Sequence, residues 1–476
     1  MTWHVILEVQ RDSPEPLGSQ IADQLRRQVE QGRLAPRSRL PSSRQLAQDL
    51  DVSRSVVVEV YEKLTGEGLL ESVRGSGTRV AAHADTRIRK PVVLVDRAIP
   101  SARFNLLPGT PNPATFPHRE WMASYQRAVT TARYQGLGYP PLLGVEPLRT
   151  ELVAYLGRVR GVLGHPDNTM VTGGFAHALG LICAALSELG IDRLAVEDPS
   201  HDRQRQFVEE NGIRTLAVPV GPEGVEIEQL YASRVRAVLV TPSHQFPLGV
   251  PMSANRRQEL VRWARDTGGW IIEDDYDGGL WLEHRGRHLA LQPADPERVI
   301  YAGTASKLLA PGLRLGWLVL PPALTSMMET VRVRRDLGGD GLMQLAFADF
   351  LRSGLLDGHL RKMRTRYRAQ HGMLTQAVER YLPAATLIGP VAGLHVVAAL
   401  PPRTDEAGLV AEALRQSVLV KGSGAYYDDP ATARPGLVLG YTALGRSGIS
   451  EAVRRIGEVY TQQSDGTRPT LMAPVS

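Results

Sequence analysis

Apolar residues recur along this chain at two different spacings, and the change of spacing divides the chain into regions. Within residues 16–32, Ile21, Leu25 and Val29 repeat at every fourth position, and Gly32 follows them. This spacing places the three side chains on one face of a helix that a glycine ends. The first 80 residues are predicted to be helix-rich, and they are dense in arginine.

Two further helices are predicted in this first region, separated by a tight turn. Ser42 or Ser43 can cap the first of them, and Ser53 can cap the second, which covers residues 54–64. The apolar face of this second helix is formed by Val57, Val60, Tyr61 and Leu64. Helix, short turn and helix in this order is the helix-turn-helix arrangement, whose second helix enters the major groove of DNA by its N-terminal residues.

Residues 68–80 are predicted to form a β-hairpin with the tip Arg74-Gly75-Ser76-Gly77. Glycines at such a tip let the backbone approach a phosphate closely, and the arginine neutralises it. The residues expected to contact double-stranded DNA are Arg44, Ser53, Arg54, Ser55, Arg74, Gly75, Ser76, Gly77 and Thr78. The alternative is a small helical docking domain whose arginines are only solvated.

From about residue 104 the pattern changes, because apolar strand-like runs alternate with amphipathic helical runs. The clearest strand-like runs are 169–172, 193–196, 236–240 and 270–272. Such alternation is typical of a mostly parallel α/β sheet covered by helices. We therefore expect a DNA-binding domain over 1–80, a linker over 81–103 and an α/β domain over 104–476.

Composition changes this picture little. The chain has 476 residues, with 43% hydrophobic and 22% charged residues, as in ordinary soluble proteins. The net charge of +5 permits nucleic-acid binding without requiring it. Cys183 is the single cysteine, so the fold needs no oxidising compartment. No apolar run is long enough for a bilayer, and the first residues do not show a basic region followed by an apolar one. We therefore expect a cytoplasmic protein without a membrane partner.

The most informative stretch for chemistry covers residues 303–317, GTASKLLAPGLRLGW. The amine of Lys307 can form a Schiff base with an aldehyde cofactor, while Thr304, Ser306 and Arg314 grip a phosphate on it. The alternative for a lone Ser-Lys pair is an exposed lysine beside a turn. No pattern in the chain indicates a bound metal.

Two other stretches complete this predicted site. Asp274 follows the strand-like run 270–272, and a carboxylate there can stabilise a protonated pyridine nitrogen. Gly174, Phe175 and Ala176 lie at a strand-turn-helix junction, whose free N–H groups bind phosphate. A cation-binding acidic loop and a helix start without a ligand are the alternatives.

The N-terminal pieces Leu-Pro-Ser-x-Arg and Gly-Ser-Gly-Thr resemble the winged helix-turn-helix of GntR-type bacterial regulators. The lysine stretch resembles the pyridoxal-phosphate segment of fold-type I aminotransferases. Together they resemble the MocR subfamily, which joins these two parts. The resemblance implies pyridoxal phosphate as cofactor, with Lys307 bound to it, Asp274 at the pyridine nitrogen and Tyr276 at the ring hydroxyl.

The resemblance assigns further residues. His244 lies in the loop that passes the ring face, and Tyr139 reaches the phosphate of a neighbouring subunit, which implies a homodimer. His201 stands where relatives often have an aromatic hydroxyl, and Arg203 is a candidate for binding an effector anion. Phe175 is a candidate for stacking on the ring. The chain departs from the family here, because Phe175-Ala176-His177 replaces Ser-Gln-Gln.

One departure bears on function. Aminotransferases clamp the substrate carboxylate with an arginine, but the corresponding segment here reads GLVLGY with Val438 in that place, while Arg434 lies nearby in sequence. The chain is therefore expected to be a DNA-binding regulator without metabolic turnover that senses pyridoxal phosphate, similar to the PdxR-type regulators of vitamin B6 synthesis. The alternatives are a sensor of an amino-acid or amine effector, and a genuine aminotransferase with a DNA-binding appendage.

Overall fold

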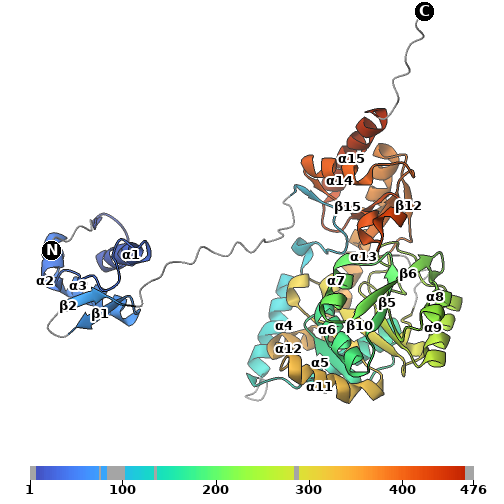
Figure 1. Ribbon diagram of the computed structural model, residues 1–476, viewed down its shortest axis with the longest axis horizontal. Helices are drawn as coiled ribbons and strands as arrows, with labels where there is room; N and C mark the ends of the chain where they lie inside the picture. The colour runs from blue at the N-terminus through green and yellow to red at the C-terminus, as the bar shows by residue number, and fades with distance from the viewer. Residues whose placement is uncertain (1–6, 74–76, 83–101, 133–136, 283–288, 467–476) are drawn as a thin grey trace, which may run out of the picture. The chain divides into compact units, whose positions relative to one another are not determined.

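The computed structural model describes residues 7–73, 77–82, 102–132, 137–282 and 289–466, on which all structural statements below rest. The chain separates into two compact units, residues 1–99 and 100–476 (Figure 1). Each unit is considered by itself. Most of the predicted linker, residues 83–101, lies outside the described residues.

The described residues of the first unit form three helices and a two-stranded hairpin. Its elements are α1 (Leu17–Glu30), α2 (Ser43–Asp49), α3 (Arg54–Gly66), β1 (Leu70–Val73) and β2 (Gly77–Val80). Ser42 caps α2 by accepting the Gln45 N–H, and Ser53 caps α3 by accepting the Val56 N–H. The three predicted helices and the hairpin are thus confirmed, with an apolar core that includes Ile21, Leu25 and Val57.

An extended N-terminal segment lies along α1. The Gln20 side chain accepts the Gln10 N–H and donates to the Gln10 carbonyl, both at 3.0 Å. The Gln24 side chain forms the same pair of hydrogen bonds with Glu8, accepting its N–H at 3.0 Å and donating to its carbonyl at 2.5 Å. A glutamine amide has the same donor and acceptor as a peptide group, so the two side chains pair with this segment as a neighbouring strand would.

The second unit is built on an eight-stranded sheet with the order β4-β11-β10-β9-β8-β5-β6-β7. Its strands are β4 (Thr169–Thr172), β5 (Arg193–Asp198), β6 (Arg214–Gly221), β7 (Gly224–Val225), β8 (Ala237–Val240), β9 (Trp270–Asp274), β10 (Val299–Thr304) and β11 (Gly316–Val319). The pairs from β10 through β9, β8 and β5 to β6 are parallel. β11 runs antiparallel to both β10 and β4. The predicted, mostly parallel sheet is confirmed.

Helices cover both faces of this sheet, because successive strand residues point to opposite sides. On one face Ala237 and Leu239 pack with α6 and α11, whereas Val238 and Val240 pack with α8 and α9 on the other. The helices of this lobe are α4 (His118–Thr131), α5 (Glu146–Arg160), α6 (Phe175–Glu188), α7 (Asp202–Glu210), α8 (Ile227–Ser233), α9 (Ala254–Thr267), α10 (Ala305–Leu308), α11 (Thr325–Arg335) and α12 (Gly341–Arg352).

A smaller lobe follows the long helix α13 (Leu355–Tyr381). Its four-stranded sheet has the order β12-β13-β16-β15, and β3 pairs with β14 beside it. Its elements are β3 (Phe104–Asn105), β12 (Thr386–Ile388), β13 (His395–Ala399), α14 (Glu406–Arg415), β14 (Val418–Leu419), β15 (Lys421–Gly422), η7 (Ser423–Tyr426), β16 (Gly436–Gly440) and α15 (Arg446–Gly466). Within the described part of the chain, no helix is long and apolar enough to cross a membrane.

Candidate functional site

Three segments of the large lobe bring the predicted cofactor residues to one edge of the sheet. Lys307 lies in α10, directly after β10, and Asp274 ends the parallel neighbour β9. The next strand, β11, pairs antiparallel with β4. In this pairing Gly316 lies opposite Thr172, just before the Gly173-Gly174 turn. The carboxyl ends of parallel strands are where ligands bind in open α/β sheets.

Lys307 is partly buried and has acidic neighbours. Burial lowers the pKa of its amine, while the charges of Asp274 and Asp277 raise it. A Cβ added to Gly109 would lie 3.2 Å from the Lys307 Nζ, so the backbone before α4 approaches the amine closely. A lowered pKa favours the neutral amine that attacks an aldehyde.

Asp274 is buried, and its two oxygens differ. Oδ2 accepts a 3.4 Å hydrogen bond from the Gln204 amide, whereas Oδ1 has no hydrogen-bond partner among the described residues. Burial raises the pKa of Asp274 to about 8, against the smaller effects of Gln204 and Lys307. A buried carboxylate oxygen without a donor fits a ligand that brings a protonated ring nitrogen.

The predicted phosphate residues form a cradle at the start of α6. Gly174 is the N-cap of α6, and its φ of 93° is a conformation that glycine adopts readily. A Cβ at Gly174 would lie 3.4 Å from Arg314 Nη1, so the guanidinium faces the first turn of the helix. Thr304 caps α10 by accepting the Ser306 N–H at 3.2 Å, and its hydroxyl lies 3.1 Å from that of Ser306. Phe175 and Ala176 are the first residues of α6, where the backbone N–H groups of a helix can donate to an anion.

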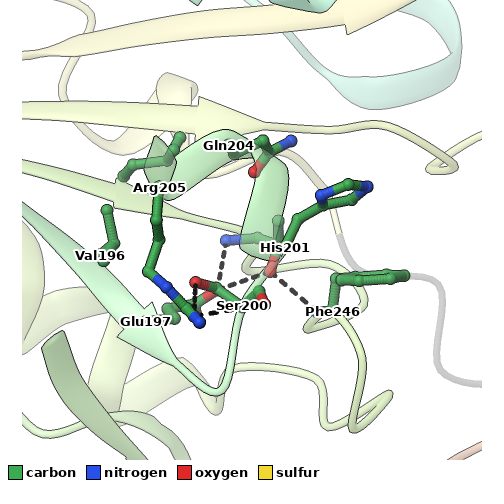
Figure 2. A pocket seen from close by; sticks show the side chains of 9 residues that line it. Val196, Glu197, Ser200, His201, Gln204, Arg205 and Phe246 are labelled. Carbon is green, nitrogen blue, oxygen red and sulfur yellow. Dashed lines mark hydrogen bonds between the residues drawn. The ribbon is translucent and has the colours of Figure 1, made fainter. Parts of the chain in front are cut away.

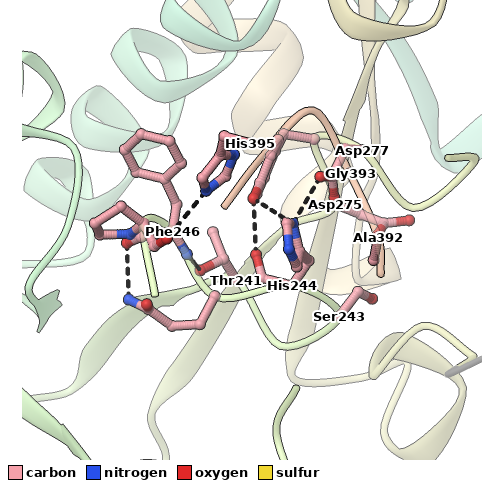
Figure 3. A network of polar contacts seen from close by, with 12 residues as sticks. Thr241, Ser243, His244, Phe246, Asp275, Asp277, Ala392, Gly393 and His395 are labelled. Atoms are coloured by element: carbon pink, nitrogen blue, oxygen red, sulfur yellow. Dashed lines mark hydrogen bonds and ion pairs between the residues drawn. The ribbon is translucent and has the colours of Figure 1, made fainter. Parts of the chain in front are cut away.

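Tyr276 and His244 belong to a buried polar network beside this cradle. The Tyr276 hydroxyl donates to the His244 carbonyl at 2.9 Å, and His244 Nδ1 lies 2.8 Å from Asp277 Oδ2 (Figure 3). Figure 3 shows His395 between the Phe246 ring and His244, with its Nε2 3.0 Å from the Pro247 carbonyl. Burial lowers the pKa of His395 to about 3, so it is neutral.

A second wall of the site comes from the start of α7 and from the small lobe. The His201 ring stacks on Phe246 with centroids 5.4 Å apart, and Figure 2 shows one ring above the other. Burial lowers the pKa of His201 to about 4. Arg205 donates to the backbone carbonyls of Tyr426 at 2.7 Å and Tyr427 at 2.9 Å, which ties the two lobes together. Arg203 is exposed on α7.

Val438, which by the resemblance stands where aminotransferases carry the clamp arginine, is fully buried. It packs in an apolar cluster with Val397 and Tyr426, against Phe246, while Arg434 is exposed. Its cross-strand neighbour is Lys421. The Lys421 Nζ lies 2.9 Å from Asp202 Oδ2 and 4.4 Å from the centre of the Tyr426 ring.

The predicted DNA-contacting residues occupy the starts of α2 and α3 and the hairpin. Arg44, Ser53, Arg54 and Ser55 are exposed, and the Arg54 Nε donates to Ser43 Oγ at 3.4 Å. Gly77, with a φ of 81°, and Thr78 begin β2. Arg74, Gly75 and Ser76 lie outside the described residues.

Comparison with known proteins supports both units. The family described as "Bacterial regulatory proteins, gntR family" matches residues 17–80, and "Aminotransferase class I and II" matches residues 110–431. The probable rhizopine catabolism regulatory protein MocR of Rhizobium meliloti is 30% identical, covering 98% of both chains. The pyridoxine biosynthesis transcriptional regulator PdxR of Corynebacterium glutamicum is 33% identical, covering 81% of this chain and 83% of the relative.

The chain belongs to the MocR subfamily of GntR-type transcriptional regulators. A kynurenine aminotransferase of Pyrococcus horikoshii, solved in complex with PMP, is similar to this MocR-type regulator in structure, with a TM-score of 0.69 and 26% identity. That similarity covers 76% of this chain and 91% of the enzyme. The fold-type I body predicted from the sequence is confirmed, and pyridoxal phosphate is its cofactor.

The described residues fit this cofactor. Bound pyridoxal phosphate supplies an aldehyde carbon for a covalent bond to a lysine amine and an electron-withdrawing ring. In this MocR-type regulator Lys307 offers a partly buried amine with a lowered pKa, and Asp274 offers an unpaired carboxylate oxygen. Arg314 and the first turn of α6 offer positive charge and N–H groups for the phosphate.

Several neighbours of the site were missed by the sequence reasoning. Gln204 reaches Asp274, Asp277 pairs with His244, and Lys421 lies beside Val438. Asp277 stands in the same strand-end run as Asp274, which was a usable signal. Gln204 and Lys421 reach the site from α7 and β15, and no motif marks them.

Proposed function

We propose that this regulator senses pyridoxal phosphate itself and controls genes of vitamin B6 synthesis. The observation that carries the proposal is Val438, which is buried in an apolar cluster at the position of the carboxylate clamp. Transamination needs the substrate carboxylate held while a proton leaves its α-carbon. A misplaced substrate alone can cost on the order of 100-fold in rate. A relative named for pyridoxine biosynthesis, at 33% identity, supports the same assignment.

The regulator would act in the cytoplasm as a homodimer, with its DNA-binding units on two half-sites of an operator. Lys307, Asp274, Tyr276, Thr304, Ser306, Arg314, Gly174, Phe175, Ala176 and His244 are the proposed cofactor contacts, and Tyr139 is proposed to complete the site of the second subunit. Cofactor binding can change operator affinity only if it favours one arrangement of the DNA-binding units over another.

The test is an anisotropy titration of full-length protein on operator DNA, without and with pyridoxal phosphate. We expect the cofactor to change operator affinity, and we expect common α-amino acids to add nothing. A transamination assay runs beside it on the same preparation. Equal affinity in both forms, or turnover of an ordinary amino acid at enzymic rates, contradicts the proposal.

A second candidate is a sensor of an anionic amine, and Lys421 favours it. Its ammonium group is a cation next to Val438, although Asp202 at 2.9 Å now neutralises it. Arg203 is the other candidate cation, on the exposed side of α7. A panel of γ-amino acids and amino sulfonates, titrated against the cofactor absorbance, separates this candidate from the first. Only the second predicts saturable spectral changes that Lys421→Ala abolishes.

A further inference from the structure

His177 folds back onto the loop that precedes its own helix. It is the third residue of α6, and its Nδ1 accepts the Gly173 N–H at 2.9 Å. This resembles a capping box, in which the third helical side chain reaches back to a backbone N–H before the helix. The contact fixes the Gly173-Gly174 turn, whose neighbouring N–H groups form the cradle.

The other ring nitrogen determines the form of the histidine. His177 Nε2 lies 2.7 Å from Asp336 Oδ2. Because Nδ1 accepts a hydrogen bond, a neutral ring carries its proton on Nε2, the nitrogen that lies near this carboxylate. Burial lowers the pKa of His177, as do the charges of Arg332 and Arg314, against the opposing effect of Asp336. The neutral form with a proton on Nε2 is therefore favoured.

The end of α11 holds both sides of the turn. Asp336 accepts the Gly338 N–H at 2.7 Å and the Arg332 Nε at 3.0 Å, so its own position is fixed. Arg332 is fully buried and donates to the carbonyl of Val171, two residues before Gly173. Arg332 thus holds β4, and His177 holds the turn that follows it.

A histidine at this position provides a hydrogen-bond acceptor without a negative charge. Capping boxes normally use Glu or Gln at the third helical residue. A glutamate here would put a negative charge beside the anion that the helix start binds. Neutral histidine accepts the same N–H without that charge. The charged groups facing it are Arg332 of α11, Asp336 directly after α11, and Arg314 from the turn before β11.

We propose that His177, oriented by Asp336, is a positioning residue that shapes the phosphate loop before the cofactor binds. The inference rests on the cofactor site proposed above. It extends that proposal by naming a residue that acts on the cofactor's phosphate through the Gly173 backbone rather than by direct contact.

The test compares three substitutions in full-length apo protein titrated with pyridoxal phosphate. His177→Ala removes the acceptor and should weaken affinity about fivefold, as expected for one neutral hydrogen bond. His177→Gln supplies a neutral acceptor and should restore most of the loss. His177→Glu supplies the acceptor with a charge, so it should bind less tightly than His177→Gln, and added salt should narrow the difference.

Thermal unfolding of the apo proteins shows whether a variant loses cofactor affinity because the phosphate loop is misplaced or because the whole fold is destabilised. His118→Ala, which alters an exposed histidine on α4, is the matched control and should bind as the unaltered protein does. Native affinity in His177→Ala overturns the inference, and so does equal weakening in His177→Ala and His177→Gln. If the unaltered protein binds no pyridoxal phosphate, the cofactor site itself fails; if it binds and the variants do not differ, only the role of His177 fails.

Discussion

Asp274 is costly to ionise until a ligand arrives. It is buried, one of its oxygens has no hydrogen-bond partner among the described residues, and burial raises its pKa to about 8. Because this lies above the unfolded value of about 3.9, the folded apo protein binds the proton more tightly than the unfolded chain. The protonated Asp274 carboxyl therefore makes its full contribution to the stability of the folded apo protein below about pH 4. This contribution is lost as pH rises through about 8.

This predicts a pH-dependent stability that a single substitution reduces. Between about pH 5 and about pH 9 the melting temperature of the apo protein should fall. The melting temperature of the Asp274→Asn protein should fall less steeply over the same range. Burial also raises the pKa values of Glu197 and Glu273 to about 7. The melting temperature of the Asp274→Asn protein should therefore still fall with pH, because these two carboxyls remain. Identical slopes in the two proteins would show that Asp274 is already ionised.

Lys307 makes the second prediction at this scale. Lys307→Ala should abolish the visible absorbance of the lysine–cofactor bond and leave no adduct after borohydride reduction, because the reacting amine is gone. Lys362→Ala, an exposed lysine on α13, is the control and should keep both signals. A reducible adduct at full stoichiometry in Lys307→Ala would assign the bond to another residue.

At the scale of elements, α3 carries the prediction for DNA. Arg54 is its first residue, with an exposed side chain, at the end of the helix that enters the major groove in helix-turn-helix proteins. Arg54→Ala should abolish specific operator binding, with a loss of about 1–3 kcal/mol or more, and leave the cofactor spectrum unchanged.

The matched control is Arg27→Ala, which alters an exposed arginine near the C-terminal end of α1. It should bind the operator almost normally in the same gel-shift assay. Retained specific binding by Arg54→Ala would show that another element reads the bases.

Local elements could be predicted from the sequence because their signals lie within a few residues. Ser53 and the apolar face of α3 are an example, and Asp274 at a strand end is another. Contacts between distant segments left no such signal. Lys421 contacts Asp202, which is 219 positions away in the sequence, and His177 contacts Asp336, which directly follows α11. The glutamine pairing along α1 was equally hidden, because glutamines on an amphipathic helix are ordinarily solvated.

At the scale of the whole molecule, Tyr139 motivates the prediction of a dimer. Its side chain is 86% exposed, which is unusual for a tyrosine and suits a residue covered by a second subunit. A dilution series in the ultracentrifuge should show dissociation together with loss of cofactor, and Tyr139→Ala should weaken cofactor binding. Tyr231→Ala, at another exposed tyrosine, should not. A monomer that keeps its cofactor contradicts this prediction.

The contact between Gly316 and Gly174 has a consequence for genetics. A Cβ on Gly316 would lie 2.9 Å from the Gly174 Cα and 2.9 Å from Thr172 Oγ1, so even one methyl group must push the phosphate loop away from β11. Gly316→Ala therefore leaves Lys307 and the residues proposed to contact DNA unchanged but deforms the cradle. Under the proposed function, a strain carrying this allele should express the target genes as if it were starved of vitamin B6, however much of the vitamin it is given.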